Sequence, residues 1–98
     1  MISFVENWTF ITNYGHVLLC IAGDPGIRLR DLAVKVGITE RATQRIVADL
    51  LVAGYLTLEK VGRRNSYHIR PDLPFRHPLE RHHPIGTLLK VLGGPAES

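Results

Sequence analysis

The stretch from residue 29 to residue 39, LRDLAVKVGIT, constrains the fold more than any other part of this chain. Its apolar residues recur at helical spacing over residues 30–36. Gly37 follows, at a point where the left-handed conformation that ends a helix costs little only for Gly or Asn. Ala33 is small and Ile38 is apolar, so a second helix can approach the first closely around an apolar plug. The stretch therefore predicts two helices that meet at a short turn.

The second of these helices is predicted over residues 40–53. Thr39 precedes it and is a good N-cap, and Gly54 follows it in the same way as Gly37 follows the first. Helical spacing gives this helix one inward face and one outward face. The positions expected to point toward the core are Thr43, Ile46, Val47 and Leu50, and the outward set is Glu40, Arg41, Gln44, Arg45 and Ala48.

A further helix is predicted before this pair. Thr12 or Asn13 is a suitable N-cap, and apolar residues at three- and four-residue spacing continue the pattern to about residue 22. The sequence Asp24-Pro25-Gly26 then predicts a turn. A short extended piece over residues 27–29 is expected between this turn and the next helix.

A β-hairpin is predicted after the last of the three helices. Residues 55–60 and 65–70 are rich in residues that favour strands, and the second run alternates polar and apolar side chains. The link Val61-Gly62-Arg63-Arg64 contains a glycine suited to a tight turn. The order of elements is therefore helix, short strand, helix, turn, helix and hairpin.

The distribution of charge indicates a polyanionic partner more clearly than the total does. The 98-residue chain has a formal net charge of +3, whereas residues 28–70 hold nine Lys or Arg and four Asp or Glu. The two ends are correspondingly acidic on balance. A basic middle of this kind favours a surface that meets nucleic acid.

Length and composition predict one globular domain over residues 1–98, with a core over about residues 12–70. Cys20 is the single cysteine, so the fold does not depend on an oxidising compartment. There is no run of about 18 apolar residues, and the N-terminal sequence lacks the basic flank of a signal peptide. We expect a cytoplasmic protein with no membrane partner.

The sequence Leu32-Ala33-x-x-x-Gly37-Ile38-Thr39 resembles the helix-turn-helix opening of the MarR and ArsR families of bacterial repressors. Further matches downstream are Arg45, Val47, Leu50, Gly54-Tyr55-Leu56 and the run from Gly62 to Tyr67. The resemblance covers residues 14–70. It implies a winged helix-turn-helix fold, which is mainly α with a small β-hairpin wing. It also implies a transcriptional regulator that binds double-stranded DNA, and we expect a repressor. It also implies a homodimer.

Three outward residues of the helix over residues 40–53 are the predicted DNA readers. Arg41 and Arg45 can bond guanine bidentately, and Gln44 can bond adenine, on base edges in the major groove. The alternative is a solvated helix face. The two arginines are like charges four residues apart, which is mildly destabilising and unusual on a face that serves stability alone.

Four other residues are predicted to assist in DNA binding. Arg63 and Arg64 are expected at the hairpin tip, from which an arginine can enter the minor groove. The alternative for these two is a solubilising turn. Thr39 caps its helix, and the backbone N–H groups there can also meet a phosphate. Arg30 is predicted to contact the DNA backbone.

The two ends of the chain contain apolar residues that need a packing surface. Residues 71–84 carry four prolines and predict an ordered loop, followed by a short helix over residues 85–92. So short a helix is not stable alone, so its apolar stripe must pack on something. The residues predicted to form a dimer interface are Trp8, Ile85, Leu88, Leu89 and Leu92. Packing within one protomer is the alternative.

Other activities find little support in the sequence. His77, His82 and His83, with Glu80 between them, are interpreted as a polar loop, and no metal or cofactor is expected. No phosphate-binding glycine loop or catalytic motif is present, so we expect no enzyme. Two alternatives to a DNA-binding regulator stay open. One is a winged helix that docks proteins, and the other is an effector- or metal-gated sensor of the same fold.

Overall fold

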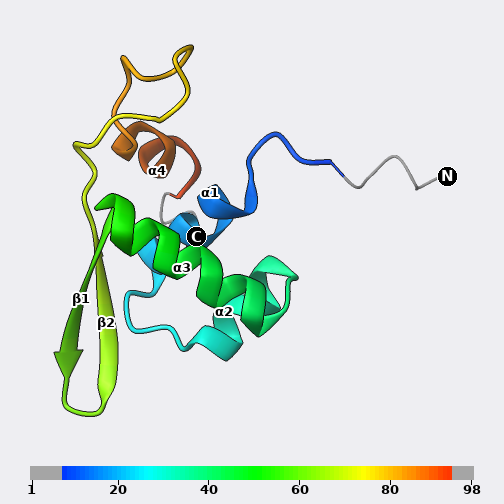
Figure 1. Ribbon diagram of the computed structural model, residues 1–98, viewed down its shortest axis with the longest axis vertical. Helices are drawn as coiled ribbons and strands as arrows, with labels where there is room; N and C mark the ends of the chain where they lie inside the picture. The colour runs from blue at the N-terminus through cyan, green and yellow to red at the C-terminus, as the bar shows by residue number, and fades with distance from the viewer. Residues whose placement is uncertain (1–7, 94–98) are drawn as a thin grey trace, which may run out of the picture.

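The computed structural model describes residues 8–93. It contains a bundle of three helices, a two-stranded hairpin on one side and a fourth helix at the C-terminal end (Figure 1). This is the winged helix-turn-helix fold that the sequence predicts. The elements are α1 (Asn13–Gly23), α2 (Leu29–Val36), α3 (Glu40–Ala53), β1 (Leu56–Val61), β2 (Arg64–Ile69) and α4 (Gly86–Leu92).

The turn between α2 and α3 forms as predicted. Gly37 has φ 86° and Gly54 has φ 89°, so each helix ends in a left-handed glycine. The side chain of Thr39 caps α3 by accepting a hydrogen bond from the Ala42 N–H at 3.0 Å. Both ends of α3 are therefore defined by local chemistry, and the predicted bounds of this helix are confirmed.

The hairpin differs from the prediction by one residue. Val61 pairs with Arg64, so the turn consists of Gly62 and Arg63 alone. Gly62 has φ 64°, and no non-glycine residue among residues 8–93 has positive φ. Positive φ at only the first central residue is the pattern of a type II′ turn, which suits the twist of a hairpin. Arg64 consequently belongs to β2 and not to the tip.

The short strand expected over residues 27–29 is not present. Leu29 already begins α2, and the sheet formed by the described part of the chain has two strands. The hairpin instead meets this region through one backbone hydrogen bond, from Tyr67 N–H to the Pro25 carbonyl at 2.9 Å. One such bond satisfies a buried donor without forming a ladder.

The core lies where the three helices meet the base of the hairpin. Its largest fully buried apolar side chains are Val17, Ile21, Leu32 and Leu56. Burial of a side chain of this size contributes about 1.5–3 kcal/mol. Thr43 is the one polar residue counted in the core of residues 8–93, and its hydroxyl donates to the Thr39 carbonyl at 2.8 Å. Its burial therefore leaves no unpaired donor.

The C-terminal segment packs on its own chain. Residues 71–84 form an ordered loop with a bridge between Pro74 and Pro84, and α4 contacts α1. Figure 1 shows α4 beside α1, at the end of the molecule away from the hairpin tip. Ile85, which precedes α4, is 8% exposed and belongs to the core. No helix within residues 8–93 is long and apolar enough to cross a membrane.

This packing buries some of the residues that are predicted to form a dimer interface and leaves others exposed. Ile85 is buried within its own protomer, which agrees with the alternative of packing within one protomer and leaves this residue little surface for a partner. Leu88 and Leu89 are half-buried against the core. Trp8 and Leu92 stay exposed, at 66% and 53%. Of the apolar N-terminal run, residues 2–7 lie outside the described residues.

A glycine at the start of α4 provides a test of this docking. A Cβ atom at Gly86 would lie 2.9 Å from the Pro71 Cβ and 3.0 Å from the Pro71 carbonyl oxygen. Gly86→Ala is therefore expected to lower the free energy of unfolding by about 1–3 kcal/mol, measured by urea denaturation. Gly23→Ala is the matched control, because nothing lies within 4 Å of its Cβ position. Equal stability of the two variants would contradict the docking of α4.

Candidate nucleic-acid interface

α3 separates its core residues from its polar residues. Thr43, Ile46, Val47 and Leu50 are buried, as predicted. Arg41, Gln44 and Arg45 are all exposed, on the face turned away from the core. Two guanidinium groups and one amide on an exposed helix face can pair with the hydrogen-bond acceptors and donors of base edges in the major groove. The structure thus gives the three predicted readers a common accessible face, and their contacts with DNA stay a prediction.

Thr39 has a structural role at the start of α3. Its side-chain oxygen caps the helix, and its carbonyl accepts hydrogen bonds from the backbone N–H and hydroxyl of Thr43. The hydroxyl oxygen is therefore already engaged. A contribution of Thr39 to DNA binding would come through the exposed helix terminus, whose partial positive charge favours a phosphate.

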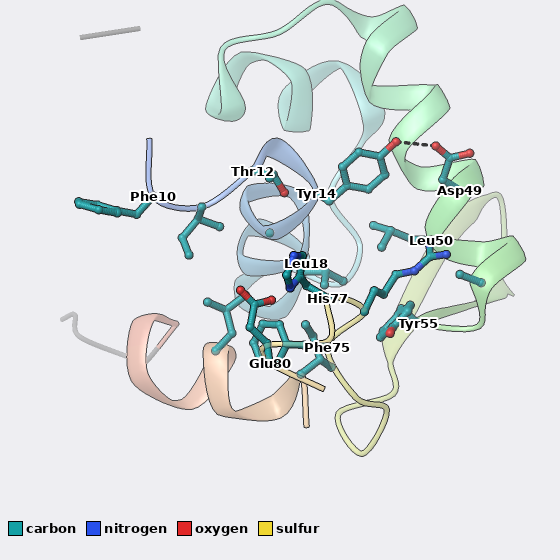
Figure 2. A pocket seen from close by; sticks show the side chains of 16 residues that line it. Phe10, Thr12, Tyr14, Leu18, Asp49, Leu50, Tyr55, Phe75, His77 and Glu80 are labelled. Atoms are coloured by element: carbon teal, nitrogen blue, oxygen red, sulfur yellow. Dashed lines mark hydrogen bonds between the residues drawn. The ribbon is translucent and has the colours of Figure 1, made fainter. Parts of the chain in front are cut away.

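A hydrogen bond between α1 and α3 was not predicted from the sequence. The Tyr14 hydroxyl donates to the Asp49 carboxylate at 2.6 Å, as the dashed line in Figure 2 shows. This bond raises the pKa of Tyr14, and the positive charges of Arg45 and Arg76 oppose the rise. The two residues are 35 positions apart, and neither belongs to a motif. The bond joins α1 to the second half of α3.

The two wing arginines have different positions. Arg63 lies in the turn and is exposed. Arg64 lies at the start of β2, and its Nη2 atom donates to the Gly26 carbonyl at 2.7 Å. The expectation that both residues sit at the tip is therefore wrong for Arg64. This side chain ties the wing to the loop between α1 and α2, which fixes the direction in which Arg63 is presented.

A groove lies between this wing and the start of α2. It has a volume of about 360 Å³, and Arg28, Arg63 and Arg64 line it. Arg30, which was predicted to contact the DNA backbone, is exposed one residue into α2. Arg28 was missed as a site residue, although it stands two positions before Arg30 in the basic middle of the chain. Three arginines around one groove favour an anion such as a phosphate.

The histidines near the C-terminus do not gather into a metal site. Among residues 8–93, no group of three His, Cys, Asp or Glu side chains could hold a metal ion. The ring centroids of His82 and His83 lie 4.2 Å apart. The His77 ring instead accepts a hydrogen bond from the Leu79 N–H at 3.1 Å, through Nδ1.

Comparison with known proteins agrees with this geometry. Residues 15–57 match the model of a family described as winged helix-turn-helix DNA-binding. The match runs from α1 through α3 into β1, and so includes the helix-turn-helix and the readers on α3. The match supports the DNA-binding winged helix-turn-helix class for this part of the chain. A search of curated proteins found no match.

The different positions of the wing arginines make a prediction about stability. Arg64→Ala removes the bond to the Gly26 carbonyl and is expected to lower the free energy of unfolding by about 1 kcal/mol. Arg63→Ala is the matched control, with the same change in charge, and should stay within about 0.5 kcal/mol of wild type. Urea denaturation measures both. A smaller loss for Arg64→Ala than for Arg63→Ala would contradict the tether.

Proposed function

We propose that this protein is a transcriptional regulator that recognises a specific sequence in double-stranded DNA, without catalysing a reaction. The observation that carries the proposal is the exposed face of α3, on which Arg41, Gln44 and Arg45 stand together directly after a capped helix start. α3 would lie in the major groove, which is wide enough to admit a helix. The three side chains would then read base edges.

The wing extends this interface to the DNA backbone and the minor groove. Arg63 projects from the turn, on a hairpin held in place by the bond from Arg64 to the Gly26 carbonyl. An arginine at such a tip suits a narrow A·T-rich minor groove, where negative potential is concentrated. Arg28 and Arg30, at the start of α2, would bond phosphates and fix the register of the protein on the duplex.

The DNA-binding proposal is tested by fluorescence anisotropy with a labelled random-sequence duplex over a salt series. Each phosphate contact contributes about 0.9 to the slope of log K against log salt. Arg41→Ala/Arg45→Ala should weaken binding markedly, and should flatten the slope if either arginine contacts a phosphate. The matched control is Arg81→Ala/Lys90→Ala, which removes the same charge outside α3 and the wing.

Two outcomes of this experiment would overturn the proposal. If wild type fails to bind at low salt, the arginines serve another purpose, and pull-down of a protein partner becomes the next step, since winged helices also dock proteins. If the two double variants lose affinity equally, net charge alone drives binding and α3 has no special role. Selection of a preferred sequence follows a positive result.

We further propose that the protein acts as a homodimer and represses by occupying promoter DNA. Exposed apolar side chains outside α3 and the wing support a self-complementary contact, among them Trp8, Val91 and Leu92. A two-fold dimer would place two α3 helices about 34–36 Å apart, to match a pseudo-palindromic site. The resemblance to dimeric repressors of the MarR and ArsR families favours the same arrangement.

The dimer is tested by mass measurement in solution at tens of micromolar. Wild type is expected at twice the mass of the chain, and Leu92→Glu is expected to shift the population toward monomer, because a charge at an apolar interface loses its hydration. Val34→Glu is the control, as this residue is equally apolar and exposed but belongs to α2. A strictly monomeric wild type would overturn the homodimer.

A further inference from the structure

The exposed face of α3 changes character along its length. The first half of the helix carries the charged and polar side chains of Arg41, Gln44 and Arg45, which are the proposed readers. Ala48 and Val52 follow on the same helix, and both are exposed. Val52 is 90% exposed, so nearly all of its apolar surface is in water. The polar face is therefore continued by an apolar strip, formed by Ala48 and Val52.

Helical periodicity places the apolar strip in line with the proposed readers. A helix turns by about 100° per residue, so residues four apart lie one turn apart on nearly the same side. Ala48 is four residues after Gln44, and Val52 is four residues after Ala48. Val52 is also eleven residues after Arg41, which is about three full turns. A helix that presents Arg41 and Gln44 to a groove thus directs the apolar strip toward the same groove.

The stability of the fold does not account for the strip. Alanine is the best helix former, so Ala48 by itself suits any exposed helix position. Valine is β-branched and a poorer helix former, and an exposed valine leaves apolar surface in water. Ile46 and Leu50 of the same helix are buried in the core, whereas Val52 is not. An apolar group on another molecule explains Val52 better than the packing of its own helix does.

The polar groups around the strip leave it free for an apolar contact. Asp49 follows Ala48 in the sequence, but its carboxylate accepts the hydrogen bond from the Tyr14 hydroxyl at 2.6 Å and is therefore directed to α1. Neither Ala48 nor Val52 has the charge or the hydroxyl group that favours contact with a phosphate. The strip is thus suited to base edges in a groove and not to the DNA backbone.

Thymine supplies the apolar group that such a strip can contact. Among the groups that base pairs present in the major groove, the thymine C5-methyl is apolar, and alanine and other apolar side chains contact it. Four residues of a helix rise by about 6 Å, which is close to two base-pair steps of about 3.4 Å each. Ala48 and Val52 are therefore spaced to meet two thymines about two base pairs apart.

We propose that Ala48 and Val52 are specificity-determining residues that contact the C5-methyl groups of two thymines, beside the base pairs read by Arg41, Gln44 and Arg45. This inference rests on the proposed function and adds the composition of the DNA site to it. Guanine or adenine lies opposite the first half of α3, and thymine lies opposite the second half. The apolar contact selects thymine over cytosine, because cytosine has no methyl group at C5.

The thymine contacts are tested on a duplex selected from a randomised pool for tight binding by the full chain. Each thymine in turn is replaced by deoxyuridine, which keeps the base pair and removes only the methyl group. Fluorescence anisotropy should show a Kd about four-fold weaker at each of two thymines, which is the effect of losing one buried methyl group. An unchanged Kd at every thymine would overturn the proposal, as would a preferred site without thymine.

Variants assign each contact to its residue. Ala48→Gly should bind the thymine and deoxyuridine duplexes equally at one of the two positions, and Val52→Ala should do so at the other. The ratio of the two Kd values within one variant does not depend on the stability of that variant. The matched controls are Ala53→Gly on α3 and Val34→Ala on α2, which change exposed residues outside the strip and should keep the wild-type ratio. Wild-type ratios in Ala48→Gly and Val52→Ala would overturn the assignment.

Failure of this inference differs measurably from failure of the proposed function. If the chain prefers one sequence, loses that preference in Arg41→Ala/Arg45→Ala, and is insensitive to every deoxyuridine, then α3 reads DNA and the apolar strip does not. That result overturns the inference and leaves the proposed function standing. If selection yields no preferred sequence, the proposed function fails and the inference fails with it.

Discussion

Burial of one face of α3 is the constraint on which the rest of the structure depends. Ile46, Val47 and Leu50 pack against α1, α2 and β1, so the opposite face of the helix must be exposed. Arg41 and Arg45 lie on that face because helical periodicity leaves them no other. The same burial holds the helix rigidly, which a reader of base edges requires, since a loosely held side chain cannot select one base over another.

The fold adds polar contacts that set the direction of each part of the interface. Arg64 ties the hairpin to the loop before α2, and Tyr14 ties α1 to the second half of α3 through Asp49. Each bond joins two elements that are distant in the sequence. The wing and α3 are consequently presented in a defined relation, as simultaneous contact with two grooves of one duplex requires.

The segment after Ile69 adds a loop and α4 to the winged helix. Ile85 enters the core and α4 contacts α1, at the end of the molecule away from the hairpin tip (Figure 1). The loop between them carries Arg76 to a pocket that also touches α3. The arrangement places a pocket and the candidate DNA-binding face on two sides of one helix.

Much of the fold was predictable, because the signals for it are local: α3 begins at the cap Thr39, and both α2 and α3 end at left-handed glycines. The exposure of Arg41, Gln44 and Arg45 follows from the same periodicity. Contacts between residues distant in sequence were not predictable. The tether of Arg64 to Gly26, the bond from Tyr14 to Asp49 and the burial of Ile85 depend on how the elements pack, and neither spacing nor composition encodes that. The sequence by itself thus determined the elements and their faces, whereas the tertiary structure alone decided which arginine is free, which apolar residues are already covered and where a pocket remains.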